Sequence, residues 1–394
     1  MSQVDMDMEQ SKPLAPMDPM LIGLVLTLLT FSTIMIASAS MAVANDRFGN
    51  PLRITGHWLV YVPMGLTIIW GVSRIELSWL KAATLNWLLP LALLLMVLVL
   101  IPGLGLRLNG AQRWFSFLGF TLQPVELVKP VVILYMAYYL SSFPERLGRF
   151  RQGVMPMLLV LGVFSCLLLL QPDFGSTMLI IAVTVAMWFL GGVPLRHMSV
   201  MVVLVVAFAA IAIAVEPYRV TRFLSFTHPW DDKLNSGYQL VQSMIAYGSG
   251  GLTGVGLGQG VQKLFYLPEA FTDFIVAVIG EELGLVGTLS LVLLFALLIG
   301  RCFHLATKTD VLYERLVVLG CTMMIAVTFI INLGASSGLL PTKGMPMPFI
   351  SYGGSALFGN CLLVGLILSV QRHLPVAHSK TKSAEYSPRM KATP

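Results

Sequence analysis

Residues 19–43 read PMLIGLVLTLLTFSTIMIASASMAV, an apolar run that contains no charged side chain. A helix needs about 20 such residues to cross the hydrocarbon core of a bilayer. Comparable runs recur as far as residue 371, and only 11% of the chain is charged, against about 25% in soluble domains. The sequence therefore predicts an all-α integral membrane protein and leaves no room for a sizeable soluble domain.

The apolar runs divide the chain into about ten transmembrane helices. We expect a cytoplasmic tail at 1–18, a single polytopic membrane domain at 19–372 and a second cytoplasmic tail at 373–394. Within the membrane domain, residues 216–272 form one long extracytoplasmic loop between helices 7 and 8, and connections of this length are usually functional or disordered. Its aromatic residues favour order. The expected spans are 19–43, 58–73, 84–102, 122–143, 154–171, 174–192, 197–215, 273–300, 313–337 and 349–371.

The basic residues indicate the orientation of the protein in the membrane. Lys and Arg collect in the cytoplasmic loops of membrane proteins. Here most of them fall in the C-terminal tail and in loops on the same side of the membrane as the N-terminus, such as those with Arg74, Arg149 and Arg301. An even number of spans then places both termini in the cytoplasm. Because residues 1–18 are acidic and no A-x-A-like cleavage site follows a basic start, we expect no cleaved signal peptide.

Composition also excludes several classes of function. Basic residues scattered between apolar runs form no single cationic surface, which argues against nucleic acid as a partner. None of the four cysteines belongs to a C-x-x-C pair, so we expect neither a disulfide framework nor a metal site, and no cofactor is predicted. A role for a divalent cation stays open. The cysteines are Cys166, Cys302, Cys321 and Cys361.

Five short polar motifs lie at helix ends on the outer side. The first combines NGAQRW at 109–114 with QPVELVK at 123–129. Glu126 and Lys129 are three residues apart and share one helical face. They either neutralise each other as the helix enters lipid or line a cavity, because charges inside a membrane usually face a partner or water.

The second motif is QPDFGST at 171–177, where a tight turn separates the fifth and sixth spans. We expect Asp173 to cap the helix that follows, because Asp is a preferred N-cap residue.

The third motif lies in the long loop and comprises PYRVTR at 217–222, GYQ at 237–239 and a glycine-rich run at 247–260. The run has no G-K-[ST] ending and no G-x-G-x-x-G register. Tightly turned backbone is therefore a better interpretation than a phosphate-binding loop.

The fourth motif, YLPEAFTDFI at 266–275, leads into the eighth span. Asp273 is either an N-cap residue stabilised by the helix dipole or a catalytic base. On a helix, small residues including Gly284 would form a stripe below this carboxylate, which packs closely on another helix or leaves room for a bound group. Glu281 and Glu282 lie deeper, and acids there should face protein or water.

The fifth motif, PTKGMPMPFISYGGS at 341–355, joins a proline-rigid entry to a helix of small residues. A helix that begins here would aim backbone N–H groups at an anion. The alternative is close helix packing through Gly353, Gly354 and Ser355.

In this order the five motifs resemble the SEDS family (shape, elongation, division, sporulation), which includes FtsW and RodA. The resemblance covers residues 20–372, and Lys343 in P-T-K-G is more similar to the FtsW, cell-division branch than to RodA. Two positions depart from the family pattern, since Phe271 stands where many members have His and Val125 where many have Ser. These departures argue against an essential role for that histidine or that hydroxyl.

The resemblance implies a peptidoglycan glycosyltransferase at the outer face of the bacterial inner membrane, acting at the division septum. Such enzymes polymerise lipid II, a lipid-linked disaccharide-pentapeptide, into glycan strands. They act beside a class B penicillin-binding protein, the septal transpeptidase, among other division membrane proteins and membrane lipids. The resemblance assigns catalysis to Asp273 in T-D-F.

Glycosyl transfer needs a base that takes a proton from the acceptor hydroxyl, and a placed carboxylate contributes about 10²–10⁴-fold. Undecaprenyl diphosphate is already a good leaving group, so we expect one essential acid and inversion at the anomeric carbon. Cations stabilise the developing negative charge of the diphosphate. The candidates for substrate binding are Arg113, Glu126, Lys129, Arg219, Arg222, Gln239, Lys263, Glu269, Lys343 and Ser351.

Two other functions fit parts of the same pattern. A flippase for lipid II would need a similar cavity and similar intramembrane charges, but it also needs access from both faces, whereas the polar motifs crowd one face. A non-catalytic scaffold for cell division would tolerate replacement of Asp273 by Asn without loss of growth.

Overall fold

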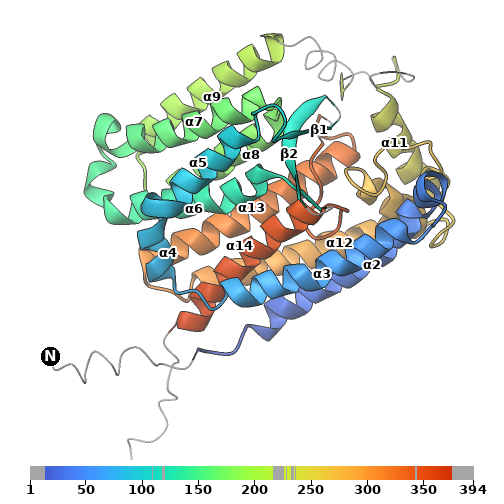
Figure 1. Ribbon diagram of the computed structural model, residues 1–394, viewed down its shortest axis with the longest axis horizontal. Coiled ribbons are helices and arrows are strands. Elements are labelled where there is room, and N and C mark those ends of the chain that lie inside the picture. The colour runs from blue at the N-terminus through green and yellow to red at the C-terminus, as the bar shows by residue number, and fades with distance from the viewer. Residues whose placement is uncertain are drawn as a thin grey trace, which may run out of the picture.

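Helices form nearly all of the regular structure, as the apolar runs predict (Figure 1). The computed structural model describes residues 14–108, 110–117, 120–215, 226–227, 229–231, 235, 237–341 and 344–374. The α-helices are α2 (Pro19–Phe48), α3 (Arg53–Val72), α4 (Leu77–Ala83), α5 (Leu89–Leu98), α6 (Pro124–Ser142), α7 (Met155–Leu170), α8 (Phe174–Leu190), α9 (Leu195–Val215), α11 (Tyr238–Gly250), α12 (Ile275–Ala306), α13 (Leu312–Ser336) and α14 (Gly354–His373). Short π- and 3₁₀-helical turns are η1 (Thr84–Leu88), η2 (Pro144–Arg146) and η3 (Phe150–Val154).

Each of the ten expected spans corresponds to a helix in the described part of the chain. Seven helical segments there are long and apolar enough to cross a membrane, two of them joining an α-helix to a neighbouring π-turn. The other three expected spans correspond to α3, α8 and α9. Ten crossings therefore remains a prediction for these three helices, while the multi-pass helical architecture is confirmed.

The interior of the bundle is formed by helices from the second half of the chain together with α6. Helix α13 packs against α12, α6, α8 and α14, and α14 also packs against α3. Among the long spans, α6, α13 and α14 bury most of their apolar windows, whereas α12 and the α4–α5 segment bury little. Apolar side chains that stay exposed on a long span face lipid in a membrane, because bilayer tails accept them as readily as a protein core does.

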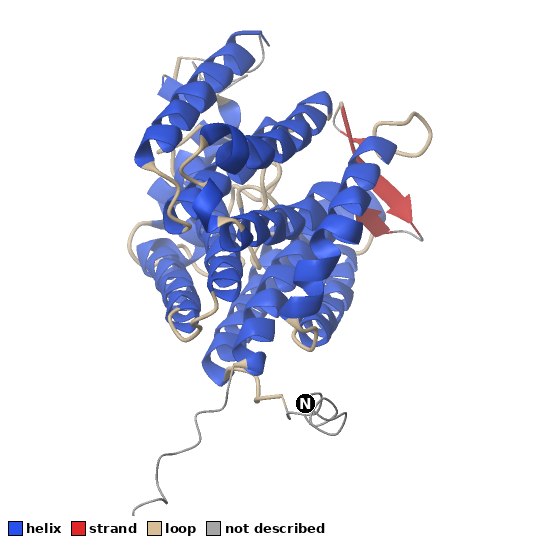
Figure 2. Cartoon of the chain, turned by 90° about the vertical axis from the view of Figure 1, so that its left-hand side faces the viewer, coloured by secondary structure: helices blue, strands red, loops and turns tan. Residues whose placement is uncertain are grey.

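A small antiparallel sheet interrupts the helical pattern between α5 and α6. Its strands are β1 (Leu106–Leu108), β2 (Ala111–Phe117) and β3 (Phe120–Leu122), in the order β1-β2-β3. Figure 2 shows the strands at one edge of the helix bundle. No sequence pattern predicted this sheet, although the polar residues of the segment marked it as a candidate for function.

Helix α12 is broken near its outer end. Gly284 has φ 66° and ψ −161°, which no helical residue adopts, so Ile275–Leu283 and the part after Gly284 are two helical pieces. Segment 250–256 takes up the freed backbone groups, since Leu285 N donates to Gly251 O and Gly256 N donates to Glu282 O. The expected continuous stripe from Asp273 to Gly284 is therefore wrong at both ends, because Asp273 lies before the first helical residue, Ile275, and Gly284 interrupts the helix.

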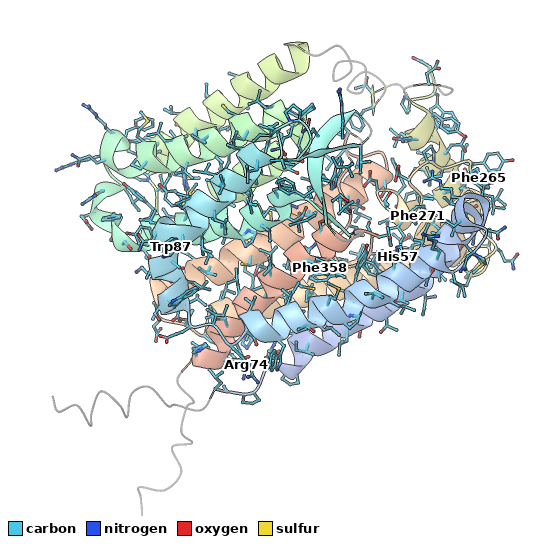
Figure 3. All side chains as sticks on the ribbon, in the orientation of Figure 1. His57, Arg74, Trp87, Phe265, Phe271 and Phe358 are labelled. Atoms are coloured by element: carbon cyan, nitrogen blue, oxygen red, sulfur yellow. The ribbon has the colours of Figure 1, made fainter. Side chains whose placement is uncertain are left out.

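Both ends of the described chain meet at one end of the bundle. Ala15 N donates to Arg372 O at 3.1 Å, and Asp18 forms an ion pair with Arg301. In Figure 3 the labelled Arg74 and Trp87 lie toward this end, while Phe265 and Phe271 lie toward the opposite one. The structure thus places Arg74 and Arg301, two of the expected cytoplasmic cations, at the end where Ala15 and Arg372 meet, and the described parts of the five polar motifs at the far end.

Candidate active site

A cavity of about 1120 Å³ lies at the end of the bundle where α12 and α14 begin. Every one of the five motifs contributes to its wall. The representative residues are Arg113, Asp173, Gln239, Asp273 and Ser355. Segments far apart in sequence therefore converge on one site, as expected if the motifs serve one function.

Asp273 lies in the segment that leads into α12, one residue before the N-cap position at Phe274. It is half-buried and lines the cavity. The Nδ2 atom of Asn332 donates to the Asp273 carbonyl oxygen at 3.1 Å. Gly344 lies close to the carboxylate, since a β-carbon there would be 3.3 Å from Asp273 Oδ2. The backbone and the carboxylate of Asp273 are thus both confined at the cavity wall.

The residues before Asp273 form a strained turn. Glu269 has φ 56°, a left-handed conformation that is uncommon without glycine. Its carboxylate accepts a hydrogen bond from Thr272 Oγ1 at 2.7 Å, and its carbonyl accepts one from Phe274 N at 3.2 Å. Glu269 therefore lines the cavity with its carboxylate already engaged by the turn that carries Asp273.

Phe271 packs against Tyr352 at the start of the fifth motif. The two rings are 5.8 Å apart and nearly perpendicular, and Tyr352 N donates to Phe271 O at 2.9 Å. Edge-to-face packing of this kind stabilises aromatic pairs. An aromatic ring at position 271 thus has a packing partner that requires no imidazole nitrogen.

Arg113 on β2 binds the turn between α7 and α8. Its Nε donates to Gln171 O at 2.7 Å, its Nη2 donates to Pro172 O, and Nη1 lies 3.9 Å from Asp173 Oδ1. Asp173 caps α8 as expected, since Oδ1 accepts from Ser176 N at 3.1 Å. The guanidinium therefore joins the first and second motifs and brings positive charge to the cavity wall.

Glu126 and Lys129 lie beside a second, much smaller space. Lys129 Nζ is 2.6 Å from Glu126 Oε1, and both side chains are largely buried. They border a chamber of about 30 Å³ that shares Gln123, Asp173 and Gly344 with the large cavity. This volume holds about two water molecules. The pair thus stands next to the large cavity and does not form its wall.

Lys263 lies apart from the large cavity, in an internal ion pair. Its Nζ is 2.5 Å from Glu282 Oε1 and also donates to Ser38 Oγ and Gly258 O. Glu281 accepts hydrogen bonds from Val261 N and Gln262 N. Both deep glutamates therefore face protein, as expected, and they anchor the glycine-rich segment.

That segment is tightly turned backbone, as the sequence favours. Gly254, Gly256 and Gly258 have φ values of 82°, 106° and 83°. A β-carbon at Gly254 would lie 2.1 Å from Glu282 O, so only glycine permits this approach.

The remaining candidate residues fall into three places. Gln239 lines the cavity from the start of α11. Ser351 is buried, its Oγ accepts from Met347 N at 2.8 Å, and it is absent from the cavity wall. Arg219, Arg222 and Lys343 lie outside the described residues.

Sequence reasoning missed two kinds of residue. Tyr61 lines the cavity from the middle of α3, where an aromatic residue in an apolar run gives no functional signal. Asn332 contacts the backbone of Asp273 from α13, and its signal was a lone amide within an apolar span. Among the described residues, no group of three or more His, Cys, Asp or Glu side chains could hold a metal ion.

The fold and this site define a class of polytopic membrane protein with a large cavity that has charged residues in its wall. Two solved structures share the fold. A structure described as "Structural coordination of polymerization and crosslinking by a peptidoglycan synthase complex" matches with a TM-score of 0.75 and 28% identity, covering 90% of this chain and 98% of that one. The Rod shape determining protein RodA of Thermus thermophilus matches with a TM-score of 0.67 and 26% identity over 91% and 97% of the two chains.

Sequence comparisons give the family. The family model FtsW/RodA/SpoVE, described as "Cell cycle protein", matches residues 19–375. A relative from Coxiella burnetii named "Probable peptidoglycan glycosyltransferase FtsW" is 43% identical, covering 90% of this chain and 95% of its own. A relative of the same name from Hahella chejuensis is 38% identical over 99% and 98%. This chain belongs to the FtsW/RodA/SpoVE family.

Proposed function

We propose that this chain is an inverting peptidoglycan glycosyltransferase that polymerises lipid II at the outer face of the bacterial inner membrane during septal wall synthesis. The observation that carries the proposal is the convergence of five motifs on one cavity that holds Asp273 in its wall. Small-molecule sites usually enclose about 300–1,000 Å³. A cavity slightly above this range suits two sugar units that must meet within it.

The chemistry assigned to Asp273 is general base catalysis. Its carboxylate takes the proton of the acceptor sugar hydroxyl while that oxygen forms a bond to the anomeric carbon of the donor. The bond from the anomeric carbon to the diphosphate breaks, and its electron pair leaves with undecaprenyl diphosphate. A single displacement of this kind inverts the anomeric carbon, and it needs no second acid because the leaving group is stable as an anion.

Two other acids line the wall, and each has a hydrogen bond within its own turn. Asp173 is engaged by Ser176 N and Ser176 Oγ as a helix cap. Glu269 accepts a hydrogen bond from Thr272. Arg113 contributes positive charge to the wall, where charge develops on the diphosphate. We propose that Gln239, Glu269 and Arg113, which line the cavity, bind substrate. Lys343, Arg219 and Arg222 remain candidates from the sequence.

A class B penicillin-binding protein is the partner that we propose. The support is the fold shared with a chain from a complex described as coordinating polymerization and crosslinking. We also propose that both termini are cytoplasmic, because Ala15 and Arg372, close to the two ends of the described chain, meet at the end of the bundle that carries Arg74 and Arg301.

The test is polymerisation of purified lipid II by wild type and by Asp273→Asn, each in complex with a cognate class B penicillin-binding protein. We expect Asp273→Asn to lose about 10²-fold or more in rate, the contribution of a placed base. Glu76→Gln removes an exposed acid from the opposite end and serves as the matched control. Wild-type polymerisation by folded Asp273→Asn, or lipid II transport without polymerisation in liposomes, would contradict the proposal.

A further inference from the structure

Asn332 occupies an unusual position in the interior of the bundle. It lies near the outer end of α13, the helix that packs on α12, α6, α8 and α14. Its side chain is only 3% exposed. Neighbouring positions on this helix are mostly apolar, so a buried amide here needs hydrogen-bond partners to offset its loss of water.

The amide nitrogen of Asn332 joins two motifs that are distant in sequence. Nδ2 donates to the carbonyl oxygen of Asp273 at 3.1 Å and to the carbonyl oxygen of Met345 at 2.8 Å. Both protons of the NH₂ group are thereby used. A hydroxyl at this position has one proton and could hold only one of the two carbonyls.

The oxygen of the same amide has no hydrogen-bond partner in the described part of the chain. Asn332 Oδ1 is buried and accepts no hydrogen bond among the described residues. An unsatisfied buried acceptor is destabilising. The position therefore uses both donors of the amide at the expense of its acceptor, which indicates that holding the two carbonyls is the role of the side chain.

The geometry of the two held segments bears directly on the carboxylate of Asp273. Met345 follows Gly344, and a β-carbon on Gly344 would lie 3.3 Å from Asp273 Oδ2. Gly344 and Asp273 both line the large cavity. Fixing the Met345 carbonyl therefore fixes the wall against which the carboxylate rests, and fixing the Asp273 carbonyl fixes the backbone from which it projects.

We propose that Asn332 is the positioning residue for Asp273, holding the T-D-F segment and the 344–346 segment in one frame through its two amide protons. This inference rests on the proposed function, because it assigns the reacting carboxylate to Asp273. Asn332 acts through Asp273 and touches no substrate.

The first experiment measures lipid II polymerisation by Asn332→Ala and Asn332→Ser in the complex with the penicillin-binding protein. We expect kcat to fall about 10²-fold for Asn332→Ala, the effect of an ångström of misplacement, with KM changed less than about threefold. Asn332→Ser keeps one donor and should lose less. Thr322→Val is the matched control, because Thr322 is buried on the same helix and its hydroxyl donates within that helix, to Val318 O.

The second experiment separates positioning from a general structural role. Each Asn332 variant is combined with Asp273→Asn, and the residual rates are compared with that of Asp273→Asn alone. A residue that acts through the carboxylate adds less than about twofold in this background, since groups acting as a unit are not additive. An equal loss in both backgrounds, or a loss confined to KM, overturns the inference.

Folding is followed in parallel by thermal unfolding of each complex. If Asn332→Ala does not fold, Asn332→Ser carries the test with the same double-variant comparison. A wild-type rate for Asp273→Asn would defeat the proposed function itself, whereas full additivity with an Asp273→Asn variant that is slow but measurable would defeat only the role of Asn332.

Discussion

Two acid-bearing regions near the start of α12 show that the same chemical group, a carboxylate, can have two different roles. Asp273 is half-buried at the wall of the large cavity. Glu281 and Glu282, two turns further on, are 2% and 0% exposed, and backbone amides, Lys263 and Ser38 occupy their oxygens. The filled acceptor sites of Glu281 and Glu282 stabilise the segment that they hold, whereas the carboxylate of Asp273 lies at a cavity where it can meet a substrate proton.

The difference follows from where the chain turns back on the helix. The glycine-rich segment lies against the break at Gly284, so its amides and Lys263 reach the glutamates. Asp273 lies before the first turn of the helix, beyond the reach of that segment. The comparison predicts that the deep glutamates control stability and that Asp273 controls the rate, and the following substitutions test this separation.

The largest effect on stability is expected from Glu282→Gln. Removing one partner of a buried pair leaves Lys263 charged and uncompensated, which is destabilising by about 3–5 kcal/mol. Unfolding of the purified protein in mixed micelles by denaturing detergent measures the change. The same measurement on Asp273→Asn should show a change below about 1 kcal/mol.

The double variant Lys263→Met with Glu282→Gln serves as the control. It removes both charges and should recover much of the lost stability, because no buried charge is then left without its partner. A stable Glu282→Gln single variant, or an unstable Asp273→Asn, would erase the proposed distinction between the two regions.

An intermediate effect is expected at the pair beside the small chamber. The single variants Glu126→Lys and Lys129→Glu each place two like charges at a buried site, and both should lose activity. The exchange of the two residues restores an opposite pair, and we expect it to be at least about tenfold more active than either single variant. Lipid II polymerisation rates, normalised to folded complex, measure this.

The recovery of activity in the exchanged variant should be incomplete for a steric reason. A β-carbon at Gly359 would lie 2.6 Å from Glu126 Oε2, so little space surrounds position 126 for a longer lysine. An exchanged variant no better than the singles would instead favour direct contact of one of these residues with substrate.

Sequence patterns predicted the residues of the site better than they predicted the tertiary contacts that hold those residues in place. The five motifs converge as short polar runs at helix ends, and Asp173 caps α8 as its position predicted. The break at Gly284 was missed because its cause is the distant glycine-rich segment, which no local pattern reveals. Lys263 was assigned to substrate by its charge and side of the membrane, whereas its partners Glu282 and Ser38 are set by tertiary packing.

The smallest effect concerns a further acid, at the end of the bundle where Ala15 and Arg372 meet. Asp18 caps α2 through Leu21 N and pairs with Arg301, whose side chain is 21% exposed. Burial acts to raise the pKa of Asp18, but the hydrogen bonds from Arg301 and Leu21 and the charge of Arg301 outweigh it and hold the pKa below 3.8. Because the guanidinium of this pair is partly exposed, the pair should contribute less than Glu282 with Lys263, whose side chains are both buried.

Asp18→Asn tests how much the charge of Asp18 contributes to stability, because an asparagine keeps the cap and removes only the charge. A lowered pKa stabilises the fold above the unfolded-state value, and this contribution is lost as pH falls through the folded-state pKa. We expect wild type to exceed the variant by about 1 kcal/mol at pH 7. Unfolding free energies measured from pH 7 downward should converge below the folded-state pKa of Asp18, and a difference that persists there would show that the carboxylate acts through packing and not through its charge.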